Sequence, residues 1–170
     1  EATVYSTTLE GLPRVGLGFR LPPRLGHATW LGRGPHENYV DRCDASVEAQ
    51  HAAELDELYT PYIYPSDNGH RSGTKWLALY APGGHGLWLG ANQLSGFSAQ
   101  RYSAAQLAAA THQEELTPSA AVHLHVDPRN HPAVHLHVDQ RMGGVGGDTG
   151  WSRSVRAPYR VPPGTHRWAL

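Results

Sequence analysis

Short runs of alternating apolar and polar or small residues, separated by glycine and proline, constrain the fold of this chain most. In the clearest run, residues 14–21 (RVGLGFRL), apolar side chains occupy every second position, and Pro22 and Pro23 end it. With 19 glycines and 13 prolines in 170 residues, many turns are expected. The sequence therefore predicts an all-β fold, an antiparallel sandwich. The further strands we expect cover residues 3–8, 28–31, 75–80, 86–91, 94–101, 154–161 and 165–170.

Local patterns also predict the segments between these strands. Residues 75–80 and 86–91 are apolar enough to be deeply buried, and the glycines between them predict a hairpin. A thin apolar stripe over residues 46–58 favours a helix, and Ser103 with Gln106 predicts the capped start of a short one. The remaining segments are a long loop over residues 32–44 and, over residues 59–65 (YTPYIYP), an aromatic run that suits a sheet edge.

Composition argues against several classes of partner. The formal net charge is −1, and charged residues make up 17% of the chain, so no basic stripe is available for nucleic acid or an acidic membrane surface. No apolar run is long enough to span a bilayer, and the first ten residues lack the pattern of a signal peptide. Because Cys43 is the only cysteine, no intrachain disulfide can form, which favours a cytoplasmic location. We expect one domain over residues 1–170.

A glycine-rich stretch over residues 141–155, RMGGVGGDTGWSRSV, leads into Trp151. Glycines allow a shaped loop that can aim an aromatic ring, and an indole suits the C–H face of a sugar. The competing interpretation is that Trp151 fills a hydrophobic core, as most tryptophans beside glycine turns do.

The heptapeptide AVHLHVD occurs twice, at residues 121–127 and 133–139, and predicts a hairpin of two strands. Alternation puts the histidines and the aspartate of each copy on one face. Four histidines close together resemble transition-metal ligands, but a metal site normally draws its ligands from more than one element, and the solvent-facing side of a hairpin is the ordinary place for alternating polar residues. The metal-ligating candidates are His123, His125, His135 and His137.

Four segments in order carry a resemblance that covers nearly the whole chain: LPRVGLGFRLP, WLGRGPHENYVDR, YTPYIYPSDNGHRSGTKWL and RMGGVGGDTGWSRSV. On these motifs the chain resembles the C-terminal, or small-chain, domain of bacterial β-galactosidases of glycoside hydrolase family 2. The resemblance implies a supersandwich related to galactose mutarotase, packed against a catalytic (β/α)8 barrel elsewhere in the polypeptide. It implies hydrolysis of terminal β-D-galactose residues in lactose-type substrates.

The resemblance also implies site residues and partners. It assigns the sugar-stacking role to Trp151 and places both catalytic glutamates on the barrel, with magnesium and sodium in the parent enzyme and no cofactor in this chain. The family's sandwich begins upstream of Glu1, so we expect a sandwich that is incomplete at its N-terminus, with an open sheet edge and a homo-oligomer.

Several polar residues are weaker candidates for sugar contacts. Asp148, Glu37 and Asn38 carry groups that can hydrogen-bond sugar hydroxyls, and Asp67 and Asn68 offer the same chemistry. For Glu37, Asn38, Asp67 and Asn68, a role as turn residues is the favoured interpretation. The tyrosines at positions 39, 59, 62 and 64 line either a cleft or an aromatic core layer, and Arg42 and Arg71 are expected to pair with nearby acids.

Two other classes of function compete with the enzyme domain. A free-standing carbohydrate-binding or aldose-epimerase-like sandwich would need a histidine and a carboxylate meeting in a cleft. A metal-binding module would use the histidine repeat.

Overall fold

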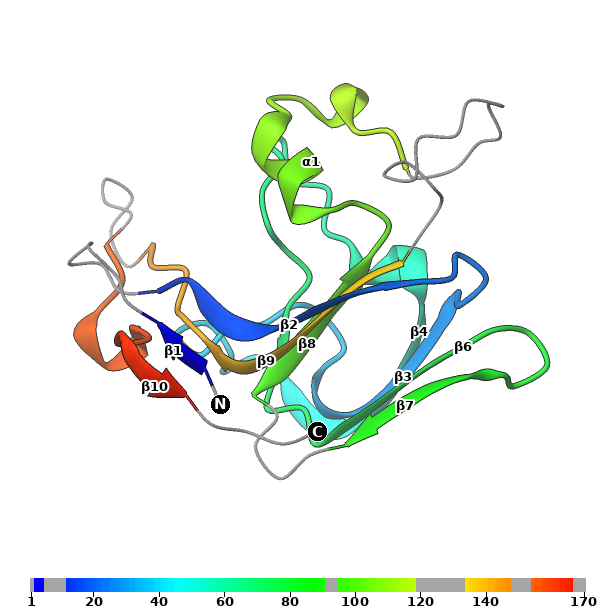
Figure 1. Ribbon diagram of the computed structural model, residues 1–170, viewed down its shortest axis with the longest axis horizontal. Coiled ribbons are helices and arrows are strands. Elements are labelled where there is room, and N and C mark those ends of the chain that lie inside the picture. Colours follow the sequence, from blue (N-terminus) through cyan, green and yellow to red (C-terminus); the bar gives the residue numbers. More distant parts are fainter. Residues whose placement is uncertain (1, 5–11, 91–94, 119–133, 148–153, 167–170) are drawn as a thin grey trace.

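Two four-stranded antiparallel sheets form the computed structural model, which describes residues 2–4, 12–90, 95–118, 134–147 and 154–166 (Figure 1). The first sheet has the order β2-β9-β8-β5, and the second has the order β4-β3-β6-β7. A separate pair joins β1 to β10. The all-β antiparallel sandwich is confirmed. The strands are β1 (Ala2–Val4), β2 (Arg14–Leu21), β3 (His27–Gly34), β4 (Val47–Glu54), β5 (Arg71–Ser72), β6 (Trp76–Tyr80), β7 (Gly86–Gly90), β8 (Gly96–Gln100), β9 (Val134–Met142) and β10 (Gly164–His166).

The main core lies between the two sheets because their strands alternate buried and partly exposed side chains. Trp30 of β3 and Phe97 of β8 are both fully buried, and their ring centroids lie 5.6 Å apart in an edge-on arrangement. The rest of this cluster is aliphatic and includes Leu77 and Leu79 from β6 and Val134, Leu136 and Val138 from β9.

The alternating run of residues 14–21 is confirmed as β2, with one difference. The pairing with β9 shifts between Val15 and Gly16, so Gln140 of β9 has no Cα partner in the register. Val15 is buried, but Leu17 is 42% exposed. The shift therefore breaks the single apolar face that alternation alone predicts.

The predicted hairpin forms from β6 and β7, and the outer strand corrects the predicted burial. β7 carries an alternating pattern of exposed and partly exposed residues, and Trp88 is 63% exposed. The prediction of a deeply buried run at residues 86–91 is therefore wrong for the part described. The reason is position, because β7 is the last strand in the order of its sheet.

The helix predicted over residues 46–58 is wrong. Residues 47–54 form β4 along the whole length of β3, and only Leu55–Leu58 turn into a short 3-10 helix. Strand pairing overrides the weak helical stripe here. β3 itself is longer than predicted and takes residues 32–34 from the expected loop.

Three further expectations are corrected or only partly covered. Residues 59–65 contain no strand, so the aromatic run is a loop rather than a sheet edge. In place of a strand over residues 154–161, the chain forms a 3-10 helix at Ala157–Tyr159 and one bridge at Val161. Of the strand expected at residues 3–8, residues 5–8 lie outside the described part.

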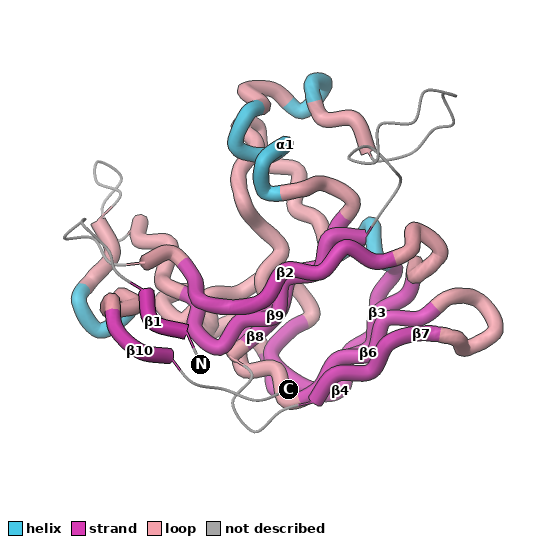
Figure 2. The backbone as a smooth tube through the Cα atoms, viewed as in Figure 1, coloured by secondary structure: helices cyan, strands magenta, loops and turns pink. Residues whose placement is uncertain are grey.

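The short helix α1 (Ala104–Ala109) is confirmed with its predicted cap. Ser103 accepts a hydrogen bond from the backbone N–H of Gln106, and the Gln106 side chain accepts one from the Ser103 N–H. Its buried Leu107 contributes to a second, smaller apolar cluster with Ala110 and Leu116. Figure 2 shows this helical segment set apart from the two sheets.

The second copy of the histidine repeat is a central strand. β9 pairs with β2 on one side and, along residues 135–139, with β8 on the other. Both edges of this stretch are occupied, so the hairpin predicted between the two copies cannot form along residues 135–139. The first copy, with His123 and His125, lies outside the described residues.

Helical segments in the described ranges are short. None of them has both the length and the apolar character needed to cross a bilayer.

Candidate functional site

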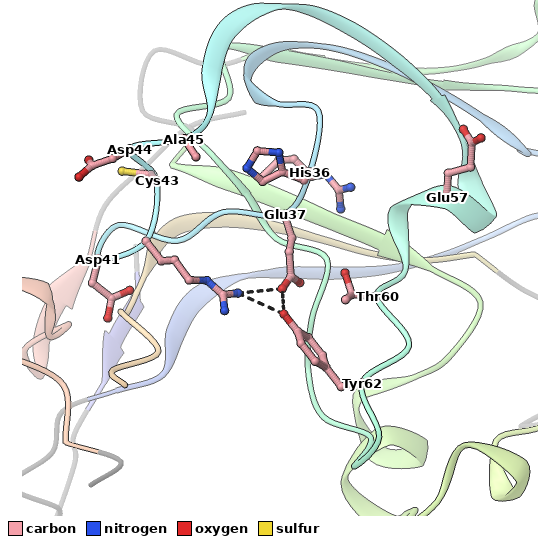
Figure 3. Close-up of a pocket in the computed structure, with 11 residues that line it drawn as sticks. His36, Glu37, Asp41, Cys43, Asp44, Ala45, Glu57, Thr60 and Tyr62 are labelled. Carbon is pink, nitrogen blue, oxygen red and sulfur yellow. Dashed lines mark hydrogen bonds and ion pairs between the residues drawn. The ribbon is translucent and has the colours of Figure 1, made fainter. Parts of the chain in front are cut away.

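Two loops border a cavity of about 660 Å³ at one end of the sandwich (Figure 3). The first loop covers residues 35–46 between β3 and β4, and the second covers residues 59–70 before β5. A third segment, residues 143–147, contacts the first loop and is called the glycine arm below. The cavity is lined by His36, Glu37, Asp41, Arg42, Cys43, Asp44, Ala45, Glu57, Thr60, Tyr62 and Arg71.

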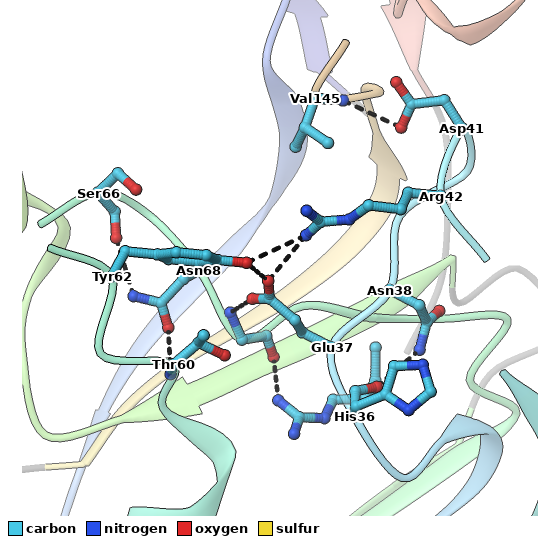
Figure 4. Close-up of polar contacts among 12 residues, drawn as sticks. His36, Glu37, Asn38, Asp41, Arg42, Thr60, Tyr62, Ser66, Asn68 and Val145 are labelled. Atoms are coloured by element: carbon cyan, nitrogen blue, oxygen red, sulfur yellow. Dashed lines mark hydrogen bonds and ion pairs between the residues drawn. The ribbon is translucent and has the colours of Figure 1, made fainter. Parts of the chain in front are cut away.

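Glu37 ties the two loops together (Figure 4). One carboxylate oxygen accepts hydrogen bonds from Arg42 (2.8 Å) and from the hydroxyl of Tyr62. The other accepts from the backbone N–H of Gly69 at 2.7 Å. Although the site is open, the Glu37 side chain is only 8% exposed. Its carboxylate is therefore already used within the protein, and the expected pairing of Arg42 with an acid is confirmed.

Asn38, like Glu37, makes its hydrogen bonds within the protein. Its side chain is fully buried, and its carbonyl oxygen accepts from both the backbone N–H (3.0 Å) and the hydroxyl (2.5 Å) of Ser72. Its amide donates to the carbonyl of His36 at 3.1 Å. Asn38 is therefore buried too deeply to contact a sugar from solution.

Arg71 is buried beneath the loops, and among the described residues it forms no ion pair with an acid. Its guanidinium donates to the carbonyl oxygens of Leu58 and Gly69, both at 2.7 Å, and of Pro35 at 3.2 and 3.3 Å. In the described part of the chain, the hydrogen-bond partners of Arg71 are therefore carbonyl oxygens and not the acid that was expected. Burial lowers the pKa of Arg71 to about 10, so the group stays charged at neutral pH. One cation thus neutralises the carbonyl dipoles of three chain segments.

Asp41 connects the first loop to the glycine arm. Its carboxylate accepts from the backbone N–H of Val145 (3.1 Å), a bond drawn in Figure 4, and from that of Gly146 (2.8 Å). Nothing beyond the residue type predicts this role, because the partners are 104 and 105 positions away.

A buried polar cluster supports the site from beneath. Arg14 donates to both oxygens of Asp139, at 3.0 and 2.5 Å, and to Asp67 at 2.9 Å. Asp139 is 1% exposed, and burial raises its pKa while Arg14 opposes the shift. Gly16 makes room for this pair, since a Cβ there would lie 2.4 Å from Asp139. The cluster fastens the 59–70 loop to the first sheet.

His70 lies against this cluster with its ring 1% exposed. Its Nδ1 is 3.6 Å from Asp139, longer than a hydrogen bond, and within the described residues neither ring nitrogen has a hydrogen-bond partner. Burial lowers the pKa of His70 to about 3, and the charges of Arg14 and Arg71 act in the same direction. A histidine and a carboxylate do meet here, but they are buried and do not line the cavity. The requirement of an epimerase site is not met by this pair.

We expect His70 to make folding sensitive to acid. The unfolded chain would bind a proton at His70 below about pH 6.5, whereas the folded chain resists it down to about pH 3, so stability falls as pH decreases across this window. Linkage gives a loss of about 2 kcal/mol between pH 7 and pH 5. Urea unfolding at the two pH values should show a loss, to which His135 and His137 also contribute because burial lowers the pKa of each, and His70→Leu should reduce the loss by about 2 kcal/mol.

Leu79→Ala supplies the control for that measurement, because it removes a buried side chain of the core that does not titrate. It should leave the difference between the two pH values as it is in the parent chain. An unchanged pH dependence in His70→Leu would contradict the assignment.

The other predicted site residues are only partly covered by the structure. Trp151 and Asp148 lie outside the described residues, as do His123 and His125. His135 and His137 lie half-buried on one face of β9, and burial lowers the pKa of each. Within the described ranges, no group of three or more His, Cys, Asp or Glu side chains is placed to hold a metal ion.

The four tyrosines divide between the two interpretations. Tyr39 is buried and stacks on His70, with ring centroids 5.5 Å apart. Tyr59 packs against Tyr102 beside the small cluster. Tyr62 lines the cavity, and Tyr64 is 63% exposed. Neither a single aromatic layer nor a cleft lined by all four is present.

Comparison with known proteins identifies the family. Residues 1–170 match the family described as beta galactosidase small chain. The chain belongs to this family. It is 38% identical over 164 residues to the β-galactosidase of Photobacterium profundum and 38% over 165 residues to that of Vibrio cholerae. It is 37% identical over 164 residues to the β-galactosidase of Aeromonas hydrophila.

These matches cover 94–95% of this chain but only 14% of each relative. The chain therefore corresponds to a small-chain domain, and most of each β-galactosidase polypeptide has no counterpart in it. The described parts of the four motifs contribute β2, the two loops and the glycine arm. Three of these, the two loops and the arm, are joined by the hydrogen bonds of Glu37 and Asp41.

Proposed function

We propose that this chain is the sandwich part of an enzyme that hydrolyses terminal β-D-galactose residues of lactose-type substrates. In this proposal a catalytic barrel lies in the remainder of the polypeptide, and Trp151 extends from the glycine arm to stack on the sugar. The family match over residues 1–170 is the observation that carries the proposal. The domain contributes orientation and apolar contact, while proton transfer belongs to the barrel.

The hydrogen bonds made by two carboxylates at the cavity are compatible with proton transfer by the barrel. A retaining glycosidase needs two available carboxyl groups about 5 Å apart. Glu37 is already bonded to Arg42, Tyr62 and Gly69, and Asp41 to two backbone N–H groups. Both carboxylates therefore have partners within this chain, and the proposal places the catalytic pair of carboxyl groups on the barrel. We therefore expect the purified chain alone to give no turnover of a chromogenic galactoside.

The test of the proposal is Trp151→Ala in the full-length β-galactosidase that carries this chain. Loss of an indole stacked on a pyranose is expected to raise KM about tenfold, because the apolar contact and its orientation disappear. Steady-state kinetics with a chromogenic galactoside measures this change.

Trp88→Ala is the matched control, since Trp88 is an exposed tryptophan on the outer strand β7. It should leave KM unaltered. A full-length Trp151→Ala enzyme with parental kinetics would exclude the stacking role.

A further inference from the structure

We propose that Asp41 is a positioning residue for Trp151, which acts by clamping the glycine arm. The inference rests on the proposed function, in which Trp151 follows the glycine arm and stacks on the sugar. Asp41 itself would not touch the substrate.

The arm is held by every backbone N–H from residue 143 to residue 146. Gly143 donates to the carbonyl of Pro13 and Gly144 to that of Tyr159, both at 2.8 Å. Val145 and Gly146 both donate to the carboxylate of Asp41. Two successive N–H groups directed at one anion form a charge-assisted contact, stronger than the two neutral bonds that precede it. Asp41 is therefore the strongest single attachment of the arm.

Close packing makes this contact specific. A Cβ atom at Gly144 would lie 2.4 Å from one carboxylate oxygen of Asp41 and 2.5 Å from its Cγ, so only glycine fits. Gly146 and Gly147 then adopt φ values of 71° and 92°, which favour glycine. The backbone conformation of Gly146 and Gly147 is thus set immediately after the clamp, and Trp151 follows Gly147 by four positions in the sequence.

Asp41 is itself held in a rigid support. It lies in a tight turn closed by two hydrogen bonds between Tyr39 and Arg42, at 2.8 and 3.2 Å. Tyr39 is 2% exposed and anchors the turn by stacking on His70. Arg42, on the other side, is bonded to Glu37. The position of the carboxylate is therefore coupled to the core rather than to a free surface loop.

The experiment is a double-mutant cycle in the full-length β-galactosidase. Asp41→Asn keeps the shape of the side chain but places an NH2 group against one backbone N–H, so one of the two bonds is lost. We expect KM to rise about tenfold, as a displaced binding group typically causes. In the Trp151→Ala enzyme, the same Asp41→Asn change should alter KM less than about twofold, because the indole that Asp41 positions is already absent.

A second variant reaches the same contact without removing the charge. Gly144→Ala displaces the carboxylate by steric overlap, and it should raise KM like Asp41→Asn with the same dependence on Trp151. This variant decides the matter if Asp41→Asn fails to fold. Glu48→Gln is the control, because Glu48 pairs with Lys75 on the exposed edge strand β4 and should leave KM unchanged.

The outcomes separate the two proposals. Parental KM in Trp151→Ala overturns the stacking role and, with it, the positioning role. A raised KM in Trp151→Ala together with parental KM in a folded Asp41→Asn enzyme overturns only the positioning role. Effects of Asp41→Asn that are equally large with and without Trp151 show a merely structural residue and also overturn the inference.

Discussion

Replacing Arg14 by methionine is expected to lower the free energy of unfolding by about 3–5 kcal/mol, because it leaves a buried carboxylate without its cation. Asp139 is 1% exposed and depends on both donors of Arg14. Methionine keeps much of the volume of the arginine stem but offers no donor. Urea unfolding at pH 7 measures the loss.

Two comparisons identify the cause of this loss. Lowering the pH should reduce the difference between Arg14→Met and the parent chain, because protonation removes the uncompensated charge of Asp139. Arg101→Met is the matched control, since Arg101 pairs at 2.6 Å with Asp56, whose side chain is 70% exposed. It should cost at most about 1 kcal/mol. A similar cost for both variants would contradict a special role for the buried pair.

Replacing Arg71 by methionine is expected to cost a similar amount, about 3–5 kcal/mol, for a different reason. It removes the donors to the carbonyl oxygens of Pro35, Leu58 and Gly69 beneath the site. Each buried acceptor left unsatisfied costs about 1–3 kcal/mol, and Arg71 is 3% exposed. Because these carbonyls belong to separate segments, hydrogen exchange at the two loops should also accelerate, which mass spectrometry can follow.

Arg71→Lys is the informative companion. Lysine retains the charge but carries one nitrogen in place of a planar fork, so it cannot reach three carbonyls at the same time. We expect a loss smaller than that of Arg71→Met but still measurable. If lysine restored full stability, charge alone would explain the residue, and the geometry of the fork would be irrelevant.

Strands were predictable from the sequence where a local pattern determined them. Residues 14–21 show the alternation that is typical of a strand, and residues 76–90 have two apolar runs joined by turn residues, which is typical of a hairpin. Residues 46–58 could not be assigned in this way, because VEAQHAAE contains good helix formers and becomes a strand only by pairing with β3. The exposure of Trp88 likewise depends on which strand ends the sheet, and a single run does not encode that position.

The candidate site was predictable as a set of motifs but not as a set of contacts. Glu37 and Asn38 were identified as polar residues of a loop, yet both prove to bond within the protein. The clamp of Asp41 and the pair of Arg14 with Asp139 join residues 104 to 125 positions apart. No periodicity links such positions, so only the folded chain could reveal them.

The pairing of β1 with β10 has a practical consequence for protein engineering. Ala2 lies opposite His166 in an antiparallel register, so the two strand ends are roughly 5 Å apart between Cα atoms. Peptides attached ahead of β1 and after β10 would therefore leave the domain from neighbouring points of the same two-stranded sheet.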